Sequence, residues 1–273
     1  MRNEMKSKLT MIALGTLAIL TGCARSETIP GTTLRLSVRM ESPETRATVH
    51  ETTGAFAWTN GDQIAVHLSS GYVDAALTAD GTNQYGTTEL AITDDNVTRT
   101  GYAIFPAGIK DVTADGVGTN LLKVTLPSSY NGVSAVTATS TPVPMVAVND
   151  PDSDLLYFHH VGGLVRIEGL SLPSGTSSVK VTFNRGVNGS FEVADRATSA
   201  PKISNVQAEG SNNSVTFNLT GTLPTVLNVP VPCGEYAWVK VYVDAATDPS
   251  HTFDGFTLAR SQGIKLTVPD PEP

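Results

Sequence analysis

Two short stretches of the sequence hold side chains of the kinds that bind metal ions. The first is the pair His159-His160. Adjacent residues of a β-strand point to opposite faces, so these two imidazoles are not expected to hold one metal ion together. A structural role for both histidines is the favoured interpretation.

The second stretch is Asp150-x-Asp152-x-Asp154, whose carboxylates have the spacing of the first ligands of an EF-hand calcium loop. Leu155 stands at the sixth position, where that loop needs glycine, and Val161 at the twelfth, where it needs a bidentate glutamate. A solvated acidic loop is favoured, and an irregular calcium site is the alternative. We expect no bound metal ion and no cofactor.

Familiar catalytic motifs are absent from the sequence. It contains no G-x-x-x-x-G-K-[ST], G-x-G-x-x-G, G-x-S-x-G or H-E-x-x-H pattern. We therefore expect a protein that is not an enzyme, with an exported hydrolase as a weak alternative. The formal net charge of −8 also argues against a nucleic-acid partner.

Several aromatic side chains could stack against sugar rings: Trp58, Tyr72, Tyr85, Tyr102, Tyr236, Trp238 and Tyr242. The last three fall on one side of a predicted strand whose other side is Ala237, Val239, Val241 and Val243. Apolar residues on both sides predict a buried strand, so we expect these aromatic rings in the core. A surface protein that binds glycans through exposed aromatic rings is the alternative function.

The chain begins with the features of an export signal. Basic residues precede an apolar run from Leu9 to Leu20, which is shorter than the ~20 apolar residues of a membrane-spanning helix. The next four residues, Leu20-Thr21-Gly22-Cys23, resemble the bacterial lipobox. We expect residues 1–22 to be removed and Cys23 to carry the lipid as the new N-terminus. Cys233 is then the only free thiol, and no disulfide can form within the chain.

Alternation of apolar and polar residues recurs along the rest of the sequence and predicts strands with one buried face. In the first segment Leu34, Leu36, Val38 and Met40 alternate with polar residues. Further segments lie at residues 64–68, 122–126, 179–183, 215–219, 239–243 and 264–268. Turn dipeptides such as Asn60-Gly61 separate them. The pattern predicts an all-β chain of antiparallel sandwiches, with a linker at 23–33 and domains at 34–170 and 171–273.

The stretch "ETRATVHE", residues 44–51, lacks apolar periodicity and is rich in threonine and charge. Such composition is typical of an exposed connector that a trypsin-like protease can reach. From composition alone a solvated charge is the favoured interpretation of Arg46, and cleavage after it is the alternative.

Several of these features occur in the order found in one known family. The segments "TTLRLSVRM", "ETRATVHE" and "FAWTNGDQIAVHL" together resemble the opening of the Bacteroidales fimbrillins, the subunits of the type V pilus. The matching residues are Phe56, Trp58, Gly61, Asp62, Ile64 and Val66, followed in "YFHHVGGLVRIEGL" by Phe158, His160, Leu164, Val165 and Ile167.

This resemblance implies two tandem transthyretin-like β-sandwich domains and export as an outer-membrane lipoprotein anchored through Cys23. It implies cleavage by an arginine-specific protease after Arg46, with Arg39 as the fallback site. The strand that carries Leu34, Leu36, Val38 and Met40 would then be lost. It further implies polymerisation with other pilus subunits by donor-strand exchange, giving an adhesive fimbrium at the cell surface.

The last alternating segment, with Ile264, Leu266 and Val268, is the candidate donor strand. The same alternation is also what a sandwich needs to complete its own sheet, so both roles stay open.

Overall fold

The computed structural model describes residues 32–41, 58–81, 85–92, 97–110, 122–138, 141–148, 152–194, 202–204 and 212–269. Within these ranges the regular elements are strands, apart from the short 3-10 helix η1 (Ala107–Ile109). The expectation of an all-β chain is confirmed. No helix in this part of the chain is long and apolar enough to cross a membrane.

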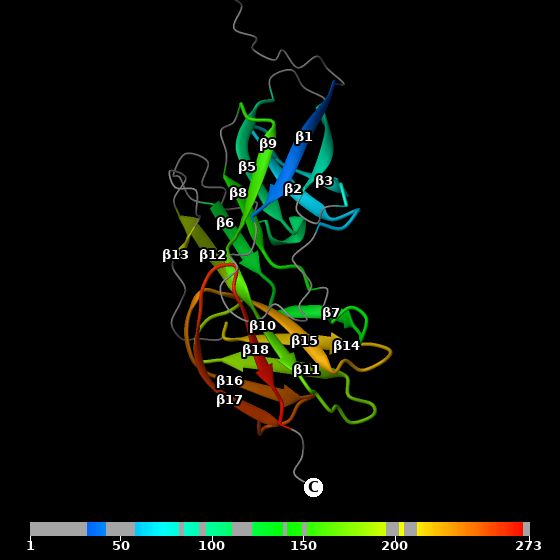
Figure 1. The fold of residues 1–273 in the computed structure, drawn as a ribbon, viewed down its shortest axis with the longest axis vertical. Helices are drawn as coiled ribbons and strands as arrows, with labels where there is room; N and C mark the ends of the chain where they lie inside the picture. Colours follow the sequence, from blue (N-terminus) through cyan, green and yellow to red (C-terminus); the bar gives the residue numbers. More distant parts are fainter. Residues whose placement is uncertain are drawn as a thin grey trace, which may run out of the picture.

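Strands from residues 32–160 form one closed barrel (Figure 1). Around the barrel the order is β1 (Thr32–Met40), β4 (Tyr85–Ile92), β3 (Gly71–Ala79), β2 (Gln63–Leu68), β5 (Arg99–Phe105), β8 (Met145–Val148) and β9 (Leu155–His160). The expected N-terminal sandwich is therefore corrected to a single closed sheet. Closure occurs because β1 pairs with β4 on one side and with β9 on the other.

The barrel encloses one apolar core, and Trp58 lies within it. Its indole packs edge-on against Phe105 and Phe158, with ring centroids 5.1 and 5.4 Å away. The alternating side chains of β1 enter the same core. Packing of this kind explains why residues with strict period-two alternation form this sheet.

Two further sheets lie on either side of a second core. One has the order β17 (His251–Leu258), β16 (Gly234–Val243), β11 (Ser178–Phe183), β14 (Ser214–Leu219) and β7 (Ser129–Val133). The other has the order β15 (Val226–Pro232), β10 (Gly162–Glu168) and β18 (Gly263–Thr267). Val165 of β10 and Val181 of β11 belong to the same buried cluster, so the two sheets share their core.

A small fourth sheet lies between these parts, in the order β13 (Lys202–Ser204), β12 (Gly189–Ala194) and β6 (Leu122–Leu126). Val124 and Phe191 of this sheet pack with Ile104 and Val146 of the barrel. The small sheet therefore adds apolar contact between the barrel and the chain that follows it.

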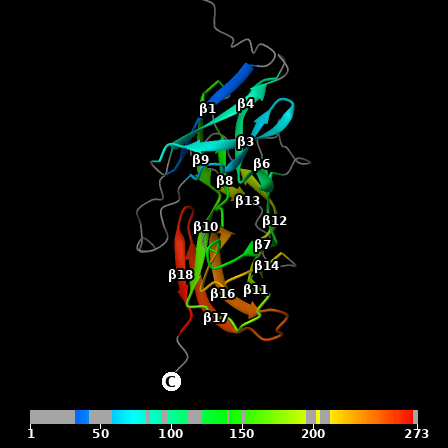
Figure 2. The ribbon, with the colours of Figure 1, turned by 90° about the vertical axis from the view of Figure 1, so that its right-hand side faces the viewer.

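The expected division at residue 170 does not coincide with the division between the sheets. β7 and β10 both precede residue 170, yet they pair with β14 and with β15 and β18. In Figures 1 and 2 the chain runs from β9 in the barrel directly into β10 of the lower sheets. Such long-range pairing has no signature in local composition, and the division into domains stays a prediction.

The junction between β9 and β10 is closely packed. A Cβ on Gly162 would lie 2.3 Å from the carbonyl oxygen of Val231, and one on Gly163 would lie 2.6 Å from that of Gln262. Only glycine allows the backbone of β10 to approach its neighbours this closely. This approach fixes the turn that contains Gln262 against the start of β10.

Candidate functional site

The first feature of the candidate site is the internal position of β1 in the barrel. The strand runs antiparallel to β4 from Thr32 to Arg39 and parallel to β9 from Ser37 to Met40. Its alternation is reproduced in the burial: Leu36, Val38 and Met40 are at most 2% exposed, and Leu34 is half-buried. These side chains therefore face the core in the expected register, while exchange of the strand stays a prediction.

Arg39, the fallback cleavage site, is held within this strand. Its guanidinium lies over the rings of Tyr85 and Tyr157, 5.3 and 5.1 Å from their centroids. Both tyrosines are its partners in register on the neighbouring strands. Proteases prefer exposed loop segments, so a doubly paired strand is a poor substrate and this geometry disfavours Arg39. Arg46 and Cys23 lie outside the described residues.

The "WTNGD" motif forms a turn that starts β2. Gly61 has φ +91°, a conformation that favours glycine. The Asp62 carboxylate accepts a hydrogen bond from the backbone N–H of Thr59 at 2.9 Å, and the Asn60 side chain accepts one from Ala79 at 2.8 Å. Burial raises the pKa of Asp62 and outweighs the opposing effect of the Thr59 hydrogen bond. The motif therefore has a structural explanation in this chain.

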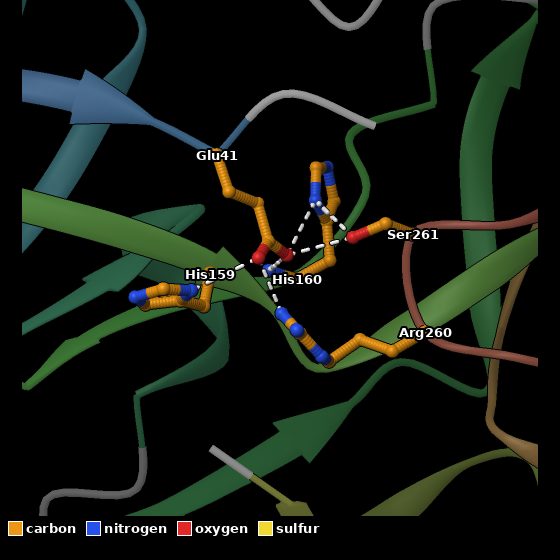
Figure 3. Close-up of polar contacts among 5 residues, drawn as sticks. All are labelled: Glu41, His159, His160, Arg260 and Ser261. Carbon is orange, nitrogen blue, oxygen red and sulfur yellow. Dashed lines mark hydrogen bonds and ion pairs between the residues drawn. The ribbon is translucent and has the colours of Figure 1, made fainter. Parts of the chain in front are cut away.

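The second feature is a buried carboxylate at the end of β1. Glu41 directly follows the strand, and its backbone N–H donates to the carbonyl of Phe158 at 2.8 Å. Its side chain is surrounded by four residues from distant parts of the chain, and together the five form the Glu41 cluster (Figure 3). The members are Glu41, His159, His160, Arg260 and Ser261.

Each oxygen of the Glu41 carboxylate accepts more than one hydrogen bond. Oε1 accepts from the His160 backbone N–H at 2.7 Å and from the Ser261 hydroxyl at 2.7 Å, and the His160 Nδ1 lies 3.2 Å away. Oε2 pairs with the Arg260 guanidinium and lies 2.9 Å from the His159 Nδ1. The figure shows these groups converging on one point from three separate segments.

Burial and hydrogen bonding act in opposite directions on Glu41. Burial by itself raises the pKa of this carboxyl group, since it removes solvent from the charged form. The hydrogen bonds from His159, His160 and Ser261 outweigh that effect and hold the pKa well below its usual range. Glu41 is therefore a stable buried anion.

The sequence reasoning on the two histidines needs correction. Adjacent strand residues were expected to diverge, yet both Nδ1 atoms reach the same carboxylate. They can do so because β9 ends at His160 and because the two oxygens of Glu41 each serve one ring. Glu41, Arg260 and Ser261 were not identified from the sequence, and the one available signal was an acidic residue directly after an alternating strand.

The candidate donor strand β18 lies at an edge of its sheet. Among the described strands it pairs with β10 alone, in parallel. Ile264 and Leu266 are half-buried, and Val268 is buried. Lys265 bonds the Glu168 carboxylate at 2.5 Å, and this hydrogen bond, with a second from Arg166, lowers the pKa of Glu168. In this structure β18 completes the sheet of its own chain, and its donation stays a prediction.

The aromatic residues differ in burial: Tyr85 is 42% exposed and Tyr72 is half-buried. Trp58, Tyr102 and Tyr236 are buried, and the Tyr236 hydroxyl donates to the carbonyl of Pro232 at 2.6 Å. Trp238 and Tyr242 are half-buried under lysine side chains, on the face of β16 away from the core. Two expectations are therefore wrong: Trp238 and Tyr242 do not lie in the core, and Tyr236 does not share a side with them.

The acidic stretch contributes an ion pair. Asp154 and Arg99 are joined at 2.9 Å, and the same guanidinium donates to the Ser153 carbonyl at 2.8 Å. Asp150 lies outside the described residues. Among the residues that the structure describes, no group of histidine, cysteine, aspartate and glutamate side chains is placed to hold a metal ion.

Comparisons with known proteins give distant structural likenesses only. No protein-family model matches the chain, and no curated protein matches it. A candidate cell adhesion protein from Bacteroides ovatus is 12% identical and has a TM-score of 0.46, over 88% of this chain and 92% of the other. One from Bacteroides uniformis is 13% identical with a TM-score of 0.43, over 86% and 92%.

A fimbrial assembly protein from Parabacteroides distasonis is 13% identical with a TM-score of 0.38, over 86% of this chain and 91% of the other. At such identities and TM-scores, the function of this chain has to be argued from its own residues.

Proposed function

We propose that this chain is the precursor of a structural subunit of a cell-surface pilus and polymerises by donor-strand exchange after proteolytic loss of β1. The observation that carries the proposal is the place of β1 in the barrel. It is paired on both sides by strands that come later in the chain. The segment with Arg46 follows it directly.

The strand does not leave the intact precursor by itself. Leu36, Val38 and Met40 are buried, and burial of one such side chain contributes ~1.5–3 kcal/mol. Covalent continuity also returns a displaced strand to its place, because its effective concentration stays high. Cleavage after Arg46 removes that constraint, so the strand can be exchanged.

Loss of β1 leaves a slot with two open sides. The facing edges of β4 and β9 then present unpaired N–H and C=O groups, and the core lacks the side chains that β1 supplied. A strand from another subunit can fill the slot, with backbone hydrogen bonds giving affinity and alternate apolar side chains giving register. Donor and acceptor surfaces differ, so the contact propagates as a filament.

The remaining parts of the proposal come from the sequence. A lipid on Cys23 would hold the precursor in the outer membrane, and a maturation protease would act at Arg46. Other pilus subunits would be the partners of the mature form in the fimbrium, where the role is adhesion. This role requires no catalytic activity.

Limited trypsin digestion of the full chain tests the proposal. We expect loss of residues up to Arg46 with the rest of the fold intact, followed by ladders of polymers on a denaturing gel. An Arg46→Gln variant should keep its N-terminal segment and form no ladder. Arg196→Gln is the matched control, since Arg196 also stands in an Arg-Ala-Thr sequence. A ladder from the Arg46→Gln variant, or none from the wild type after cutting, would overturn the proposal.

Glycan binding is the second candidate function, and Trp238 and Tyr242 are the residues that favour it. Their rings lie on the outer face of β16, each beneath a lysine ammonium at 4.7 or 4.8 Å. An affinity gel that contains polysaccharide separates the two functions. A retarded band that is lost in a Trp238→Ala variant, with no polymer after trypsin, would favour glycan binding.

A further inference from the structure

The environment of Glu41 forms a receptor for a carboxylate, and it is built from parts of the chain that stay when β1 leaves. A cut after Arg46 lies beyond Glu41, so the glutamate departs with the strand. The residues that surround it remain: His159, His160, Arg260 and Ser261, which we call the carboxylate receptor.

Part of this receptor is held in place without Glu41. Arg260 and Ser261 lie in the turn between β17 and β18, which is closed by a bond from the Gln262 N–H to the Ala259 carbonyl at 3.2 Å. The Ser261 N–H donates to Gly162 at 3.0 Å, and Leu164 donates to Gln262 at 2.9 Å. The turn is thus fixed against β10 by backbone hydrogen bonds.

Ser261 also adopts a conformation that is unfavourable for its residue type. Its φ is +60°, a value at which glycine is the usual residue. In this position the hydroxyl bonds the carboxylate at 2.7 Å and lies 3.1 Å from the His160 Nδ1. Backbone strain of this kind persists where the surrounding structure or a function requires it.

An empty receptor would be energetically unfavourable. The Arg260 side chain is 31% exposed and the two histidine side chains 10% or less, so water replaces a lost carboxylate only in part. Buried donors that lose their charged acceptor carry a desolvation cost. The filled slot therefore requires an anion at this place as well as apolar side chains in the core.

Resting on the proposed function, we infer that the carboxylate receptor selects the incoming strand by an acidic side chain. The occupant is a strand of another subunit that enters in the direction of β1. Its aspartate or glutamate directly follows the last inward apolar residue, as Glu41 follows Met40. The carboxylate would fix the register of the donor strand. It would also determine which subunit can supply that strand.

The C-terminal strand of this chain does not meet that requirement. Its inward residues would be Ile264, Leu266 and Val268, so a residue equivalent to Glu41 must have an odd number. Positions 265, 267, 269 and 271 are lysine, threonine, proline and proline, and the acidic residues Asp270 and Glu272 have the wrong parity. A shift by one residue would turn the apolar side chains out of the core. The C-terminal strand of another copy of this chain is therefore a weaker donor than a strand that supplies the acidic residue.

Peptide exchange into the cut protein tests the inference. The full chain is cut with trypsin, and the trypsin is then inhibited. Fluorescent peptides of residues 33–43 are added, with an acylated N-terminus and an amidated C-terminus. We expect the wild-type peptide to be retained about ten- to a hundredfold better than its Glu41→Gln form, the factor for hydrogen bonds to a charged group. In a cut Arg260→Gln protein this preference should shrink.

A second peptide pair tests the parity argument. The cut protein should retain the peptide of residues 262–271 poorly. It should retain the Pro269→Glu form of this peptide better, by a factor of about ten or more. The Pro269→Gln peptide controls for the backbone N–H that the substitution restores, and it should bind less well than the glutamate form.

The outcomes separate this inference from the proposed function. If the wild-type peptide and its Glu41→Gln form are retained equally, the requirement for an acidic residue is wrong. The proposed donor-strand exchange is not contradicted by that result. A lack of exchange by any peptide into the cut protein overturns both.

Discussion

Strands β1 and β18 have the same alternation of apolar and polar residues, but β1 is attached to the rest of the fold much more firmly than β18. Each runs parallel to one neighbour, β9 or β10. β1 has β4 on its other side, whereas β18 has no strand there among the described residues. The inward side chains of β1 are nearly all buried, while Ile264 and Leu266 of β18 are half-buried. Attachment is thus decided by the number of neighbours and by the buried area, and hydrophobic pattern alone does not reveal it.

This difference bears on how each strand would exchange. β1 is held by two ladders and a buried charge cluster, so under the proposed function its removal requires cleavage of the chain. β18 is held by one ladder and by the surface contact of Lys265 with Glu168. Four experiments test this contrast, and they follow in order of decreasing expected effect.

The largest effect is expected from a charge placed in the barrel core. Val38→Asp should lower the free energy of unfolding by about 4 kcal/mol or more, since Val38 is 1% exposed and no partner awaits a carboxylate there. Leu266→Asp in β18 should cost about half as much or less. Urea denaturation of the full chain measures both. Ser37→Asp, on the exposed side of β1, is the control, and an equal loss in that variant would refute the register.

The next effect concerns the charge at the end of β1. Glu41→Ala should destabilise the full chain by about 3 kcal/mol, because Arg260 and the histidine donors lose their acceptor. Glu41→Gln should cost less, since an amide oxygen still accepts hydrogen bonds. A double-mutant cycle with Arg260→Ala should give a clear coupling energy. Additive effects in that cycle would show that the cluster does not connect β1 to the 259–262 turn.

The same carboxylate predicts a dependence on pH. Its pKa is lowered from 4.5 in the folded protein by the hydrogen bonds of His159, His160 and Ser261, against the opposing effect of burial. A lowered pKa means that the stabilisation is fully present above pH 4.5 and is lost as the pH falls below it. The difference in unfolding free energy between wild type and Glu41→Gln should therefore shrink from pH 6 toward about pH 3. A constant difference would contradict the assignment.

The smallest effect is expected at Arg39. Arg39→Ala removes the guanidinium from between Tyr85 and Tyr157 and should cost about 1 kcal/mol. It should leave trypsin release at Arg46 unchanged, which mass spectrometry of the fragments can check. Release that disappears with Arg39→Ala would make Arg39 the cleavage site, in spite of its double pairing.

A good part of the strand pattern could be predicted from the sequence. The segments with period-two alternation, from Leu34–Met40 to Ile264–Val268, coincide with strands, because side-chain direction in a strand is fixed by the pleat of the backbone. The inward face of β1 follows from the same rule. Tyr236 departs from it: Tyr236 is buried together with Val239, and between them the Ala237 N–H bonds the Asn184 side chain.

Only local features could therefore be predicted from the sequence: an all-β chain, the position of its strands and most of the residues on their inward faces. Closure of the barrel through β1, the crossing of β10 into the lower sheets and the Glu41 cluster were decided by the tertiary structure. The physical reason is distance along the chain. The Glu41 cluster forms only after strands from separate regions of the chain have paired. No short-range sequence pattern predicts that contact.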